Sequence, residues 1–354
     1  MVFEERVARP MRKPLVSIVI VTYNSSEYIK VCLESLLAIT YKPHEIVVMD
    51  NSSTDNTKDI LSKYEGKINI FSSKNVGFAE GVNKAVRKAE GKYVFLINPD
   101  TKVSQGFLQP LVAVMEANNK VAACQPLIYL MKKKKTINLT GKTTQYLGFD
   151  WIKDYKEKIV PERHEISSFS GSGVMIRKSI FSKCGGFDPI YFMYHEDTDL
   201  SWKFRLLGYK LLFIPESVIY HDYKYIPKES YHPLKNKLKY YERNRLTTII
   251  KNYQTKTLML LSPIIITIEF AMLAFSILQG WFLQKLQGYG HIIKNARKIR
   301  ASRLFIQKKR VVSDKELVNS FKAGLYFKEF QIFPVKYIVN PLLSIYWTLI
   351  RIFI

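Results

Sequence analysis

The sequence is poor in cysteine and in acidic residues, and its start lacks a long apolar segment. Its 354 residues include 3 Cys, too few and too scattered for a disulfide scaffold or a Cys-rich zinc site. Lys+Arg number 54 against 30 Asp+Glu, which gives a formal net charge of +24. Residues 1–14 mix acids and bases and have no secretory-signal core. We therefore expect three small buried cysteines and an N-terminal half that stays in the cytoplasm.

The excess of positive charge lies in the last third of the chain. Residues 226–354 hold 22 Lys+Arg and 6 Asp+Glu, whereas residues 1–225 hold 32 and 24. The same part contains two apolar runs, 258–283 and 332–354, each long enough to cross a bilayer. Basic and apolar residues together are typical of a protein that binds phospholipid. We expect a membrane partner and no nucleic acid.

The charges around the apolar runs leave two arrangements open. The linker 284–331 carries 12 Lys+Arg against 3 Asp+Glu, and residues 235–256 are also basic. A single span by 258–283 would move one basic flank across the membrane, against the positive-inside tendency. A re-entrant or in-plane arrangement, with Pro263 and Glu269 interrupting a straight span, therefore stands beside two true transmembrane helices.

From residue 16 onward, strand-like and helix-like segments alternate. The expected strands are 16–22, 45–50, 68–73 and 92–100, and the expected helices begin near Ser25 or Ser26, near Thr54 and at Phe78. This order predicts an α/β fold with a parallel, doubly wound sheet. Composition agrees, because 47% hydrophobic residues allow a large core and exclude global disorder.

Polar residues follow all four expected strands, where ligands bind in such sheets. These strand ends are Thr22 to Asn24, Asp50 to Ser53, Ser73 to Asn75 and Asn98 to Asp100. Four polar ends, two with a carboxylate, predict a binding site. The Asp100 carboxylate suits a hard cation such as Mg²⁺ or Mn²⁺.

A second group of acids starts a later expected helix. Glu196, Asp197 and Asp199 follow an aromatic run. Acids in a first turn meet the helix dipole, but three in four positions exceed what capping requires, and a partly buried carboxylate there is a plausible general base. The sequence is not HExxH, since position 199 is Asp, so a zinc protease is not supported. His221 follows a strand and matters only if it faces Asp100.

Together these segments resemble the family-2 inverting glycosyltransferases of the GT-A fold, in particular the rhamnosyltransferase-like branch. The resemblance covers about 16–225 and depends on the joint order of VSIVIVTYN, VVMDNSSTDNT, KNVGFAEGVNKA, FLINPD, GSGVMIRK, GGFDPIYFMYHEDTDLSWKFRLLGYKL and the His of VIYH. It implies a Rossmann-like, mostly parallel sheet flanked by helices. The expected organisation is an N-terminal tail (1–15), a catalytic domain (16–225), a basic connecting helix (226–257) and a membrane-associated helical region (258–354).

The resemblance also implies residues that hold the nucleotide sugar. They are Thr22, Tyr23, Asn24, Asp50, Ser52, Asn75, Gly77, Phe78, Asn83 and Asn98. Within this set, Tyr23 would cover the base and Asp50 would accept a hydrogen bond from a pyrimidine N–H.

Metal and catalytic roles follow from the same resemblance. Asp100 stands where the family's DxD motif ends, and Asn98 replaces the first acid, which makes a second metal ligand more necessary. His221 matches the position that can supply it. Asp197 matches the catalytic base, with Glu196 beside it. The Gly171, Ser172 and Gly173 positions match a loop near the donor sugar and acceptor.

The implied activity is metal-dependent, inverting transfer from a UDP- or dTDP-linked sugar, with Mg²⁺ or Mn²⁺ as cofactor. The acceptor would be a hydroxyl of a polyprenyl-linked glycan used for cell-surface polysaccharide or glycoconjugate, at the cytoplasmic face of the cell membrane. A polyprenyl-phosphate sugar synthase would use the same fold. A processive synthase fits less well, because YYERNR (240–245) stands after the catalytic domain and no QxxRW occurs. A non-catalytic basic protein binding membrane or nucleic acid would explain the charge but not Asp50, Asp100 and Asp197 together.

Overall fold

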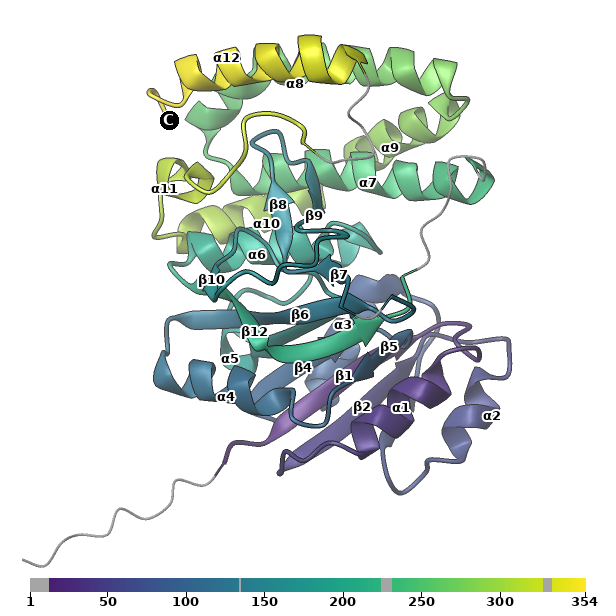
Figure 1. The fold of residues 1–354 in the computed structure, drawn as a ribbon. Helices are drawn as coiled ribbons and strands as arrows, with labels where there is room; N and C mark the ends of the chain where they lie inside the picture. Colours follow the sequence, from purple (N-terminus) through teal and green to yellow (C-terminus); the bar gives the residue numbers. More distant parts are fainter. Residues whose placement is uncertain (1–12, 134, 224–230, 327–332) are drawn as a thin grey trace, which may run out of the picture.

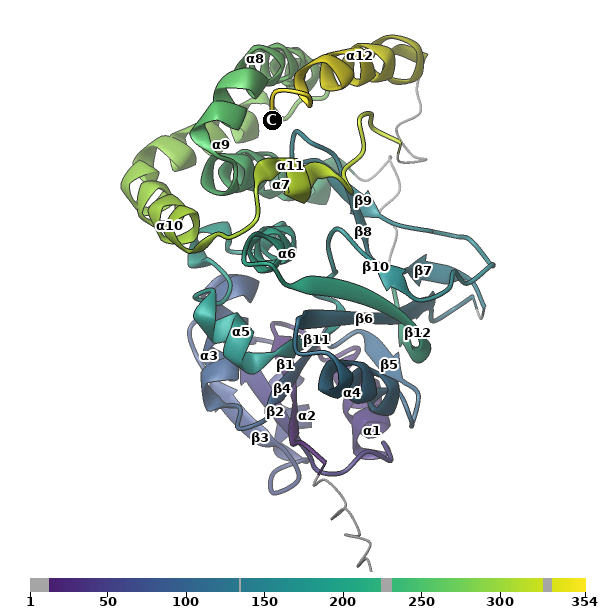
Figure 2. The ribbon, with the colours of Figure 1, turned by 90° about the vertical axis from the view of Figure 1, so that its left-hand side faces the viewer.

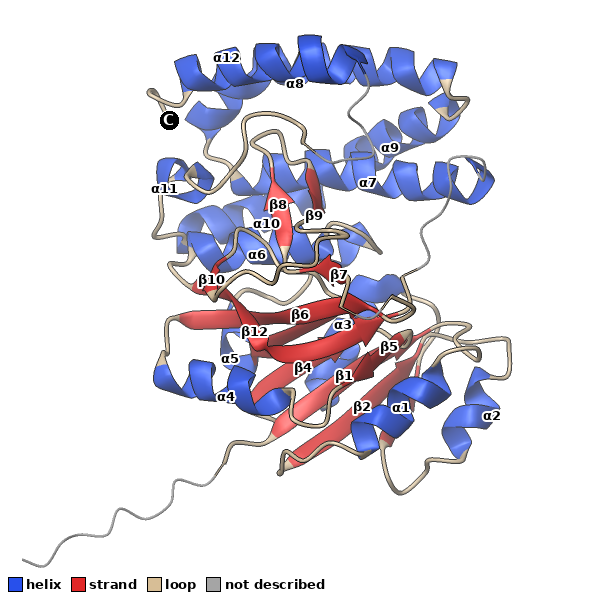
Figure 3. Cartoon of the chain, in the orientation of Figure 1, coloured by secondary structure: helices blue, strands red, loops and turns tan. Residues whose placement is uncertain are grey.

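The computed structural model describes residues 13–133, 135–223, 231–326 and 333–354 (Figure 1). A ten-stranded sheet with flanking helices forms one part, and a helical assembly covers one end of it (Figure 3). Most of the expected N-terminal tail and residues 226–230 of the expected connecting helix lie outside the described residues.

The N-terminal half of the sheet is parallel. Its strands are β1 (Val16–Thr22), β2 (His44–Asp50), β3 (Asn69–Ser72) and β4 (Tyr93–Ile97), in the order β3-β2-β1-β4. Helices α1 (Ile29–Leu37), α2 (Thr57–Ser62) and α3 (Gly77–Lys88) alternate with them. Because β1 is buried on both faces, Val19 packs in the core with α3 and Ile18 in the core with α1. The predicted doubly wound arrangement is confirmed here.

The other half of the sheet is mixed. Strand β11 (Gly173–Arg177) runs antiparallel between β4 and β6 (Val121–Leu130), and β12 (Lys210–His221) runs parallel to β6. The short strands are β5 (Thr101–Val103), β7 (Ile137–Leu139) and β10 (His164–Glu165) at this side of the sheet, and β8 (Lys142–Thr144) with β9 (Asp150–Ile152) as a separate hairpin. The sheet is therefore mixed: the predicted parallel order holds in its N-terminal half, whereas β11 at the centre and the short strands β5, β7 and β10 are antiparallel to their neighbours.

The remaining helices form three successive sets, starting from those that pack on the sheet (Figures 1 and 2). Those against the sheet are α4 (Leu108–Ala117), α5 (Lys178–Lys183) and α6 (Glu196–Leu206), and the short η1 (Pro189–Tyr191) contacts α3. Beyond them come α7 (Tyr231–Asn252), α9 (Phe282–Lys294), α10 (Ala296–Lys309) and α11 (Asp314–Val318). Outermost and side by side are α8 (Thr255–Leu278) and η3 (Val335–Val339) with α12 (Asn340–Ile350).

Three local expectations are wrong in detail. Helix α8 continues through Pro263 and Glu269 without interruption, and the apolar run turns into α9 at Gly280. Helix α1 begins after Tyr28, not near Ser25 or Ser26, because the Ser25 carbonyl closes a turn with Tyr28 and Ile29. Helix α3, for which the sequence pattern predicts an end at Gly91, ends at Lys88. A Cβ on Gly91 would lie 2.6 Å from the Ser17 nitrogen, so this glycine permits close packing on β1.

Candidate active site

The ends of β1 and β2 form one polar turn. Thr22 and Asp50 are partners in the strand register, and the Thr22 hydroxyl donates to Asp50 Oδ1 at 3.1 Å. Asp50 is 1% exposed and also accepts from the Ser53 N–H at 3.1 Å. The predicted hydrogen bond from the nucleotide base would have to use a lone pair of the Asp50 carboxylate that these contacts leave free. That contact stays a prediction. Tyr23 beside it is 51% exposed, so its ring is accessible.

Two further residues of this turn have left-handed backbones. Asn24 has φ +50° and Ser52 has φ +68°, a conformation that non-glycine residues adopt mainly at strained or functional sites. The Asn24 side chain accepts from the Thr54 N–H at 2.8 Å, which joins the turn after β1 to the turn after β2. The structure thus brings the five predicted nucleotide-binding residues of these turns together.

The start of α3 contacts the chain that leads to α6. Gly77 has φ +82°, and a Cβ there would lie 2.5 Å from the Phe192 carbonyl oxygen, so only glycine fits. Asn75 Oδ1 accepts from the Gly77 N–H at 3.0 Å. Asn83 binds both the carbonyl and the N–H of Phe187, at 2.8 and 3.0 Å. These contacts give Asn83 a positioning role and do not test its predicted contact with the nucleotide sugar.

The two predicted metal ligands are neighbours. His221 Nε2 lies 3.2 Å from Asp100 Oδ1, and its Nδ1 lies 2.9 Å from Asn138 Oδ1. If Nδ1 donates its proton to Asn138, the lone pair of Nε2 faces a carboxylate oxygen. Asp100 Oδ1 is buried and has no hydrogen bond to the described residues. A divalent cation between these atoms would satisfy both, so the residues fit the predicted metal.

The chain supplies few ligands for such a metal. Within the described residues, no group of three or more His, Cys, Asp and Glu side chains is placed to hold an ion. Mg²⁺ commonly takes one or two protein carboxylates and completes its shell with phosphate oxygens and water. Asp100, whose side chain is partly exposed, and His221 would supply two ligands. This number suits a metal that binds together with a diphosphate.

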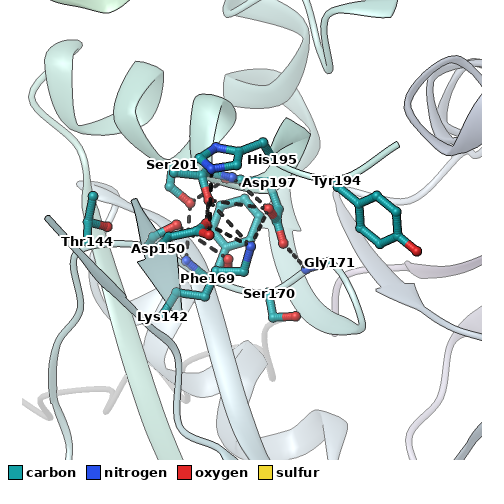
Figure 4. Close-up of polar contacts among 12 residues, drawn as sticks. Lys142, Thr144, Asp150, Phe169, Ser170, Gly171, Tyr194, His195, Asp197 and Ser201 are labelled. Atoms are coloured by element: carbon teal, nitrogen blue, oxygen red, sulfur yellow. Dashed lines mark hydrogen bonds and ion pairs between the residues drawn. The ribbon is translucent and has the colours of Figure 1, made fainter. Parts of the chain in front are cut away.

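Asp197 lies between a glycine loop and a buried lysine (Figure 4). The Gly171 N–H donates to Asp197 Oδ2 at 3.1 Å, and Lys142 Nζ donates to Oδ1 at 2.7 Å. Lys142 also pairs with Asp150 Oδ2 at 3.0 Å. Burial by itself would lower the pKa of Lys142, but the two carboxylates raise it above its usual value. The lysine thus remains a cation that fixes Asp197 beside the loop.

The glycine loop connects Asp197 to the Asp100 side of the site. The Asn98 N–H donates to the Ser172 carbonyl at 3.3 Å. The Phe78 ring approaches the loop from α3, 3.4 Å from the position of a Cβ on Gly171. At Gly173 a Cβ would lie 2.3 Å from Ile219. The predicted donor and acceptor loop is therefore packed between both groups of acids.

The three acids at the start of α6 have different surroundings. Burial, and then the Asp197 charge, raise the pKa of Glu196 to about 8, so its carboxyl is protonated at neutral pH. Asp199 is fully buried and pairs with Lys203 and Lys251, both at 3.0 Å. These lysines hold the pKa of Asp199 below its usual range although burial acts in the opposite direction. Asp199 therefore joins α6 to α7, and Asp197 is the acid held at the loop.

The segment before α6, residues 190–195, is strained and clamped by α7. Phe192, Tyr194 and His195 have φ of +62°, +64° and +68°, at a cost of about 1–3 kcal/mol each. The buried Asn244 side chain donates to three carbonyl groups, those of Tyr191, Met193 and Tyr194, at 3.0, 2.9 and 2.7 Å. Arg243 Nη2 adds a bond to the Tyr191 carbonyl at 3.1 Å. Helix α7 therefore fixes the segment that ends at Glu196 and Asp197.

Sequence reasoning missed Lys142, Asp150 and Asn244. Lys142 lies 55 positions before Asp197, in a stretch with no recognisable motif, so no local pattern marks it. Asn244 lies in YYERNR, where a polar cluster inside a helix was a signal. Its contacts depend on the folding of α7 against residues 190–195, which spacing along the chain does not reveal.

Comparison with known proteins agrees with this geometry. A family described as glycosyl transferase family 2 matches residues 17–185. N-acetylglucosaminyl-diphospho-decaprenol L-rhamnosyltransferase of Mycobacterium tuberculosis is 25% identical over 58% of this chain and 75% of its own length. Rhamnosyltransferase WbbL of Escherichia coli is 28% identical over 66% of this chain and 94% of its own.

A solved structure shows the same fold. GalNAc-T7 with UDP, GalNAc and Mn²⁺ has a TM-score of 0.56 and 18% identity, over 70% of this chain and 49% of the GalNAc-T7 chain. The order of the strands, the acids at the strand ends and the similar proteins all indicate a glycosyltransferase. The chain is a glycosyltransferase whose residues 17–185 match glycosyl transferase family 2, and it has a GT-A-like fold.

Proposed function

We propose that the protein transfers a hexose or deoxyhexose from UDP or dTDP to a hydroxyl of a polyprenyl-linked glycan, with inversion at the anomeric carbon. The proposal depends on one observation: the loop 171–173 connects Asp197 to the strand end that carries Asp100. Asp197 binds the N–H of Gly171, and Ser172 of the same loop binds Asn98, two residues before Asp100. A relative is named as a rhamnosyltransferase acting on a decaprenol-linked sugar, which supports the acceptor class.

Asp197 would act as the general base. An acceptor hydroxyl is a poor nucleophile near neutral pH, and a carboxylate that takes its proton during attack lowers the barrier. The Lys142 and Gly171 contacts fix the carboxylate orientation. One base and attack from the face opposite the diphosphate give inversion without a covalent intermediate.

Asp100 and His221 would hold the divalent cation, whose charge offsets the negative charge that grows on the leaving diphosphate. The Asn138 amide orients the His221 ring, as outer partners of metal-binding histidines commonly do. The Mn²⁺ in the GalNAc-T7 structure supports a cation of this class, and both Mg²⁺ and Mn²⁺ suit the ligand set.

The metal role predicts a change in nucleotide affinity. UDP or dTDP should bind at least tenfold more tightly with Mn²⁺ than with EDTA, measured by isothermal titration calorimetry. Asp100→Asn and His221→Ala should remove most of this enhancement, because each leaves only one ligand. Asp59→Asn, an exposed acid on α2, is the control and should retain it. Equal nucleotide affinity with and without the metal would contradict the proposal.

We also propose that α8 and α12 lie in the plane of a bilayer, with the catalytic part on the cytoplasmic side. Helix α8 has the length and composition to span a membrane. Its inner side, however, contacts the protein along its length. Leu261 and Ser276 are fully buried, and Glu269 Oε2 binds Lys285 and Tyr289 of α9 at 2.8 and 2.6 Å. A helix held in this way along one side is better suited to lie on the membrane than to cross it.

The outer side of the same layer is apolar. Its exposed side chains are Met259, Ile266, Phe270, Ile277 and Leu278 of α8 and Leu342, Ile345 and Leu349 of α12. The two helices are joined by a bond from the Tyr346 hydroxyl to the Leu260 carbonyl. Basic residues on both sides of α8 would favour an anionic, cytoplasmic leaflet.

The membrane proposal predicts binding to vesicles. The protein should float with phosphatidylglycerol-containing liposomes, and the double variant Phe270→Glu, Leu349→Glu should bind at least tenfold more weakly, because each buried apolar side chain contributes about 1.5–3 kcal/mol. Ile159→Glu is the control, since Ile159 is 87% exposed and lies outside this layer. Wild-type protein that stays unbound, or an equal loss in the control, would contradict the in-plane layer.

A further inference from the structure

A hollow of about 470 Å³ lies between the η1 segment and helices α7, α9 and α10. Its lining includes Ile190, Phe192, Tyr240, Arg243, His291 and Lys298. It is separate from the Asp100–His221 pair and from Asp197, since none of these residues lines it. Three basic side chains from three different helices converge on it.

The acid in the lining is already neutralised. Asp188 Oδ2 lies 2.7 Å from Lys251 Nζ and accepts from the Ser302 hydroxyl at 2.8 Å. Its charge is therefore turned toward α7 and α10 and does not cancel the charge of Arg243 or of Lys298. The charge left in the hollow favours an anion.

His291, which lines this hollow, has an unpartnered ring nitrogen among the described residues. Its Nδ1 lies 3.2 Å from Arg243 Nη1, and a guanidinium only donates, so Nδ1 accepts and the ring proton is on Nε2. That atom is buried and has no hydrogen bond of good geometry to the described residues. Burial, and then the Arg243, Lys239 and Lys294 charges, lower the pKa of His291 to about 4, although the Ile190 carbonyl acts in the opposite direction.

Arg243 is held in place before any ligand binds. Its guanidinium donates to the Tyr191 carbonyl and lies over the Tyr240 ring, 4.6 Å from the centroid. Tyr240 in turn stacks on Phe192 with centroids 5.6 Å apart. A fixed guanidinium, a buried N–H and an exposed lysine at one hollow are the donor set that recognises phosphate oxygens.

We propose that this hollow binds a diphosphate group. The volume exceeds the needs of a single phosphate, and donors from three helices can surround two phosphoryl units. The inference goes beyond the proposed function, because it does not depend on the donor site or its metal. The diphosphate has two possible sources, the head group of a polyprenyl diphosphate and a free diphosphate.

A ligand in this hollow would touch the catalytic segment directly. Ile190 and Phe192 line the hollow, and the same chain reaches Glu196 and Asp197 a few residues later. Phe192 also packs on Gly77 at the start of α3. Diphosphate binding would therefore stabilise the strained conformation of residues 190–195.

The test measures binding of inorganic pyrophosphate and of geranyl diphosphate by calorimetry. EDTA is present so that Asp100 and His221 hold no metal. Lys298→Glu should weaken binding at least tenfold. Arg297→Glu is the control: it makes the same charge change on the same helix at an exposed residue that does not line the hollow, and it should weaken binding less than threefold.

The two ligands distinguish the sources. Tighter binding of geranyl diphosphate assigns the hollow to a lipid head group, and equal binding assigns it to free diphosphate. Wild-type protein that binds neither ligand, or equal losses in the two variants, would overturn the proposal. Binding of UDP with Mn²⁺ is measured in parallel and should be the same in both variants. A failure of that binding alone would count against the proposed transferase site and not against this hollow.

Discussion

Replacing Asp197 by Asn should lower the rate of sugar transfer by a factor of about 10²–10⁴, the usual contribution of a general base. The amide keeps the size of the carboxylate and can still accept from the Gly171 N–H, but it cannot take the acceptor proton. Binding of the nucleotide with Mn²⁺ should be unchanged. The measurement is kcat for release of nucleoside diphosphate in the presence of acceptor.

Glu196→Gln is the matched control for this prediction. Glu196 is protonated at neutral pH because burial, and then Asp197, raise its pKa to about 8, and glutamine resembles the protonated acid. We therefore expect the Gln variant to keep most of the activity. Full activity of Asp197→Asn, together with a large loss in Glu196→Gln, would transfer the base role to Glu196.

Asn244→Ala should lower kcat by roughly 10²-fold, a loss comparable to a displacement of about 1 Å at the reacting groups. The substitution removes one amide group that binds the carbonyls of Tyr191, Met193 and Tyr194. Without it, residues 190–195 can leave their left-handed conformations and move Asp197. The KM for the nucleotide sugar should change much less than kcat, because the strand-end turns are not touched.

Asn252→Ala separates this effect from a general loss of stability. Asn252 is a buried asparagine of the same helix, and its amide donates to Asp199 Oδ1 at 2.8 Å and to the Thr248 carbonyl at 2.9 Å. Both variants should lose about 1–3 kcal/mol of unfolding free energy through unpaired buried groups. Only Asn244→Ala should lose kcat in the folded protein. Equal losses of kcat would mean that α7 acts on activity through stability alone.

The parallel half of the sheet could be predicted because its signals are local. Val16–Thr22 is an apolar run with a polar end, and the strand occupies those residues. Helix ends were less accurate, since the start of α1 depends on a turn closed by the Ser25 carbonyl. The continuity of α8 through Pro263 goes against the local tendency of proline to break a helix. The Met259 carbonyl, which has no N–H partner at Pro263, accepts from the Ser262 hydroxyl at 2.8 Å instead.

The site residues also fall into those with a local sequence signal and those that only long-range packing brings together. Asp100 and His221 carry recognisable neighbours in the sequence, and the structure places them 3.2 Å apart. Lys142 is brought to Asp197 by the β8–β9 hairpin, whose position depends on long-range packing. The family resemblance singled out Asp197 as the base, but residue type alone did not separate it from Glu196 and Asp199, because burial and neighbouring lysines distinguish the three acids.

Transfer from a panel of UDP- and dTDP-sugars to a polyprenyl-diphosphate-linked acceptor tests the central claim most directly. Product configuration is read by NMR, and polyprenyl phosphate serves as the competing acceptor. We predict acceptor-dependent release of nucleoside diphosphate that stops with EDTA, with an inverted anomeric carbon and a new bond to a sugar hydroxyl. Transfer to polyprenyl phosphate instead would indicate a lipid-phosphate sugar synthase. Retained configuration, or metal-independent transfer, would contradict the roles given to Asp197 and to the Asp100–His221 pair.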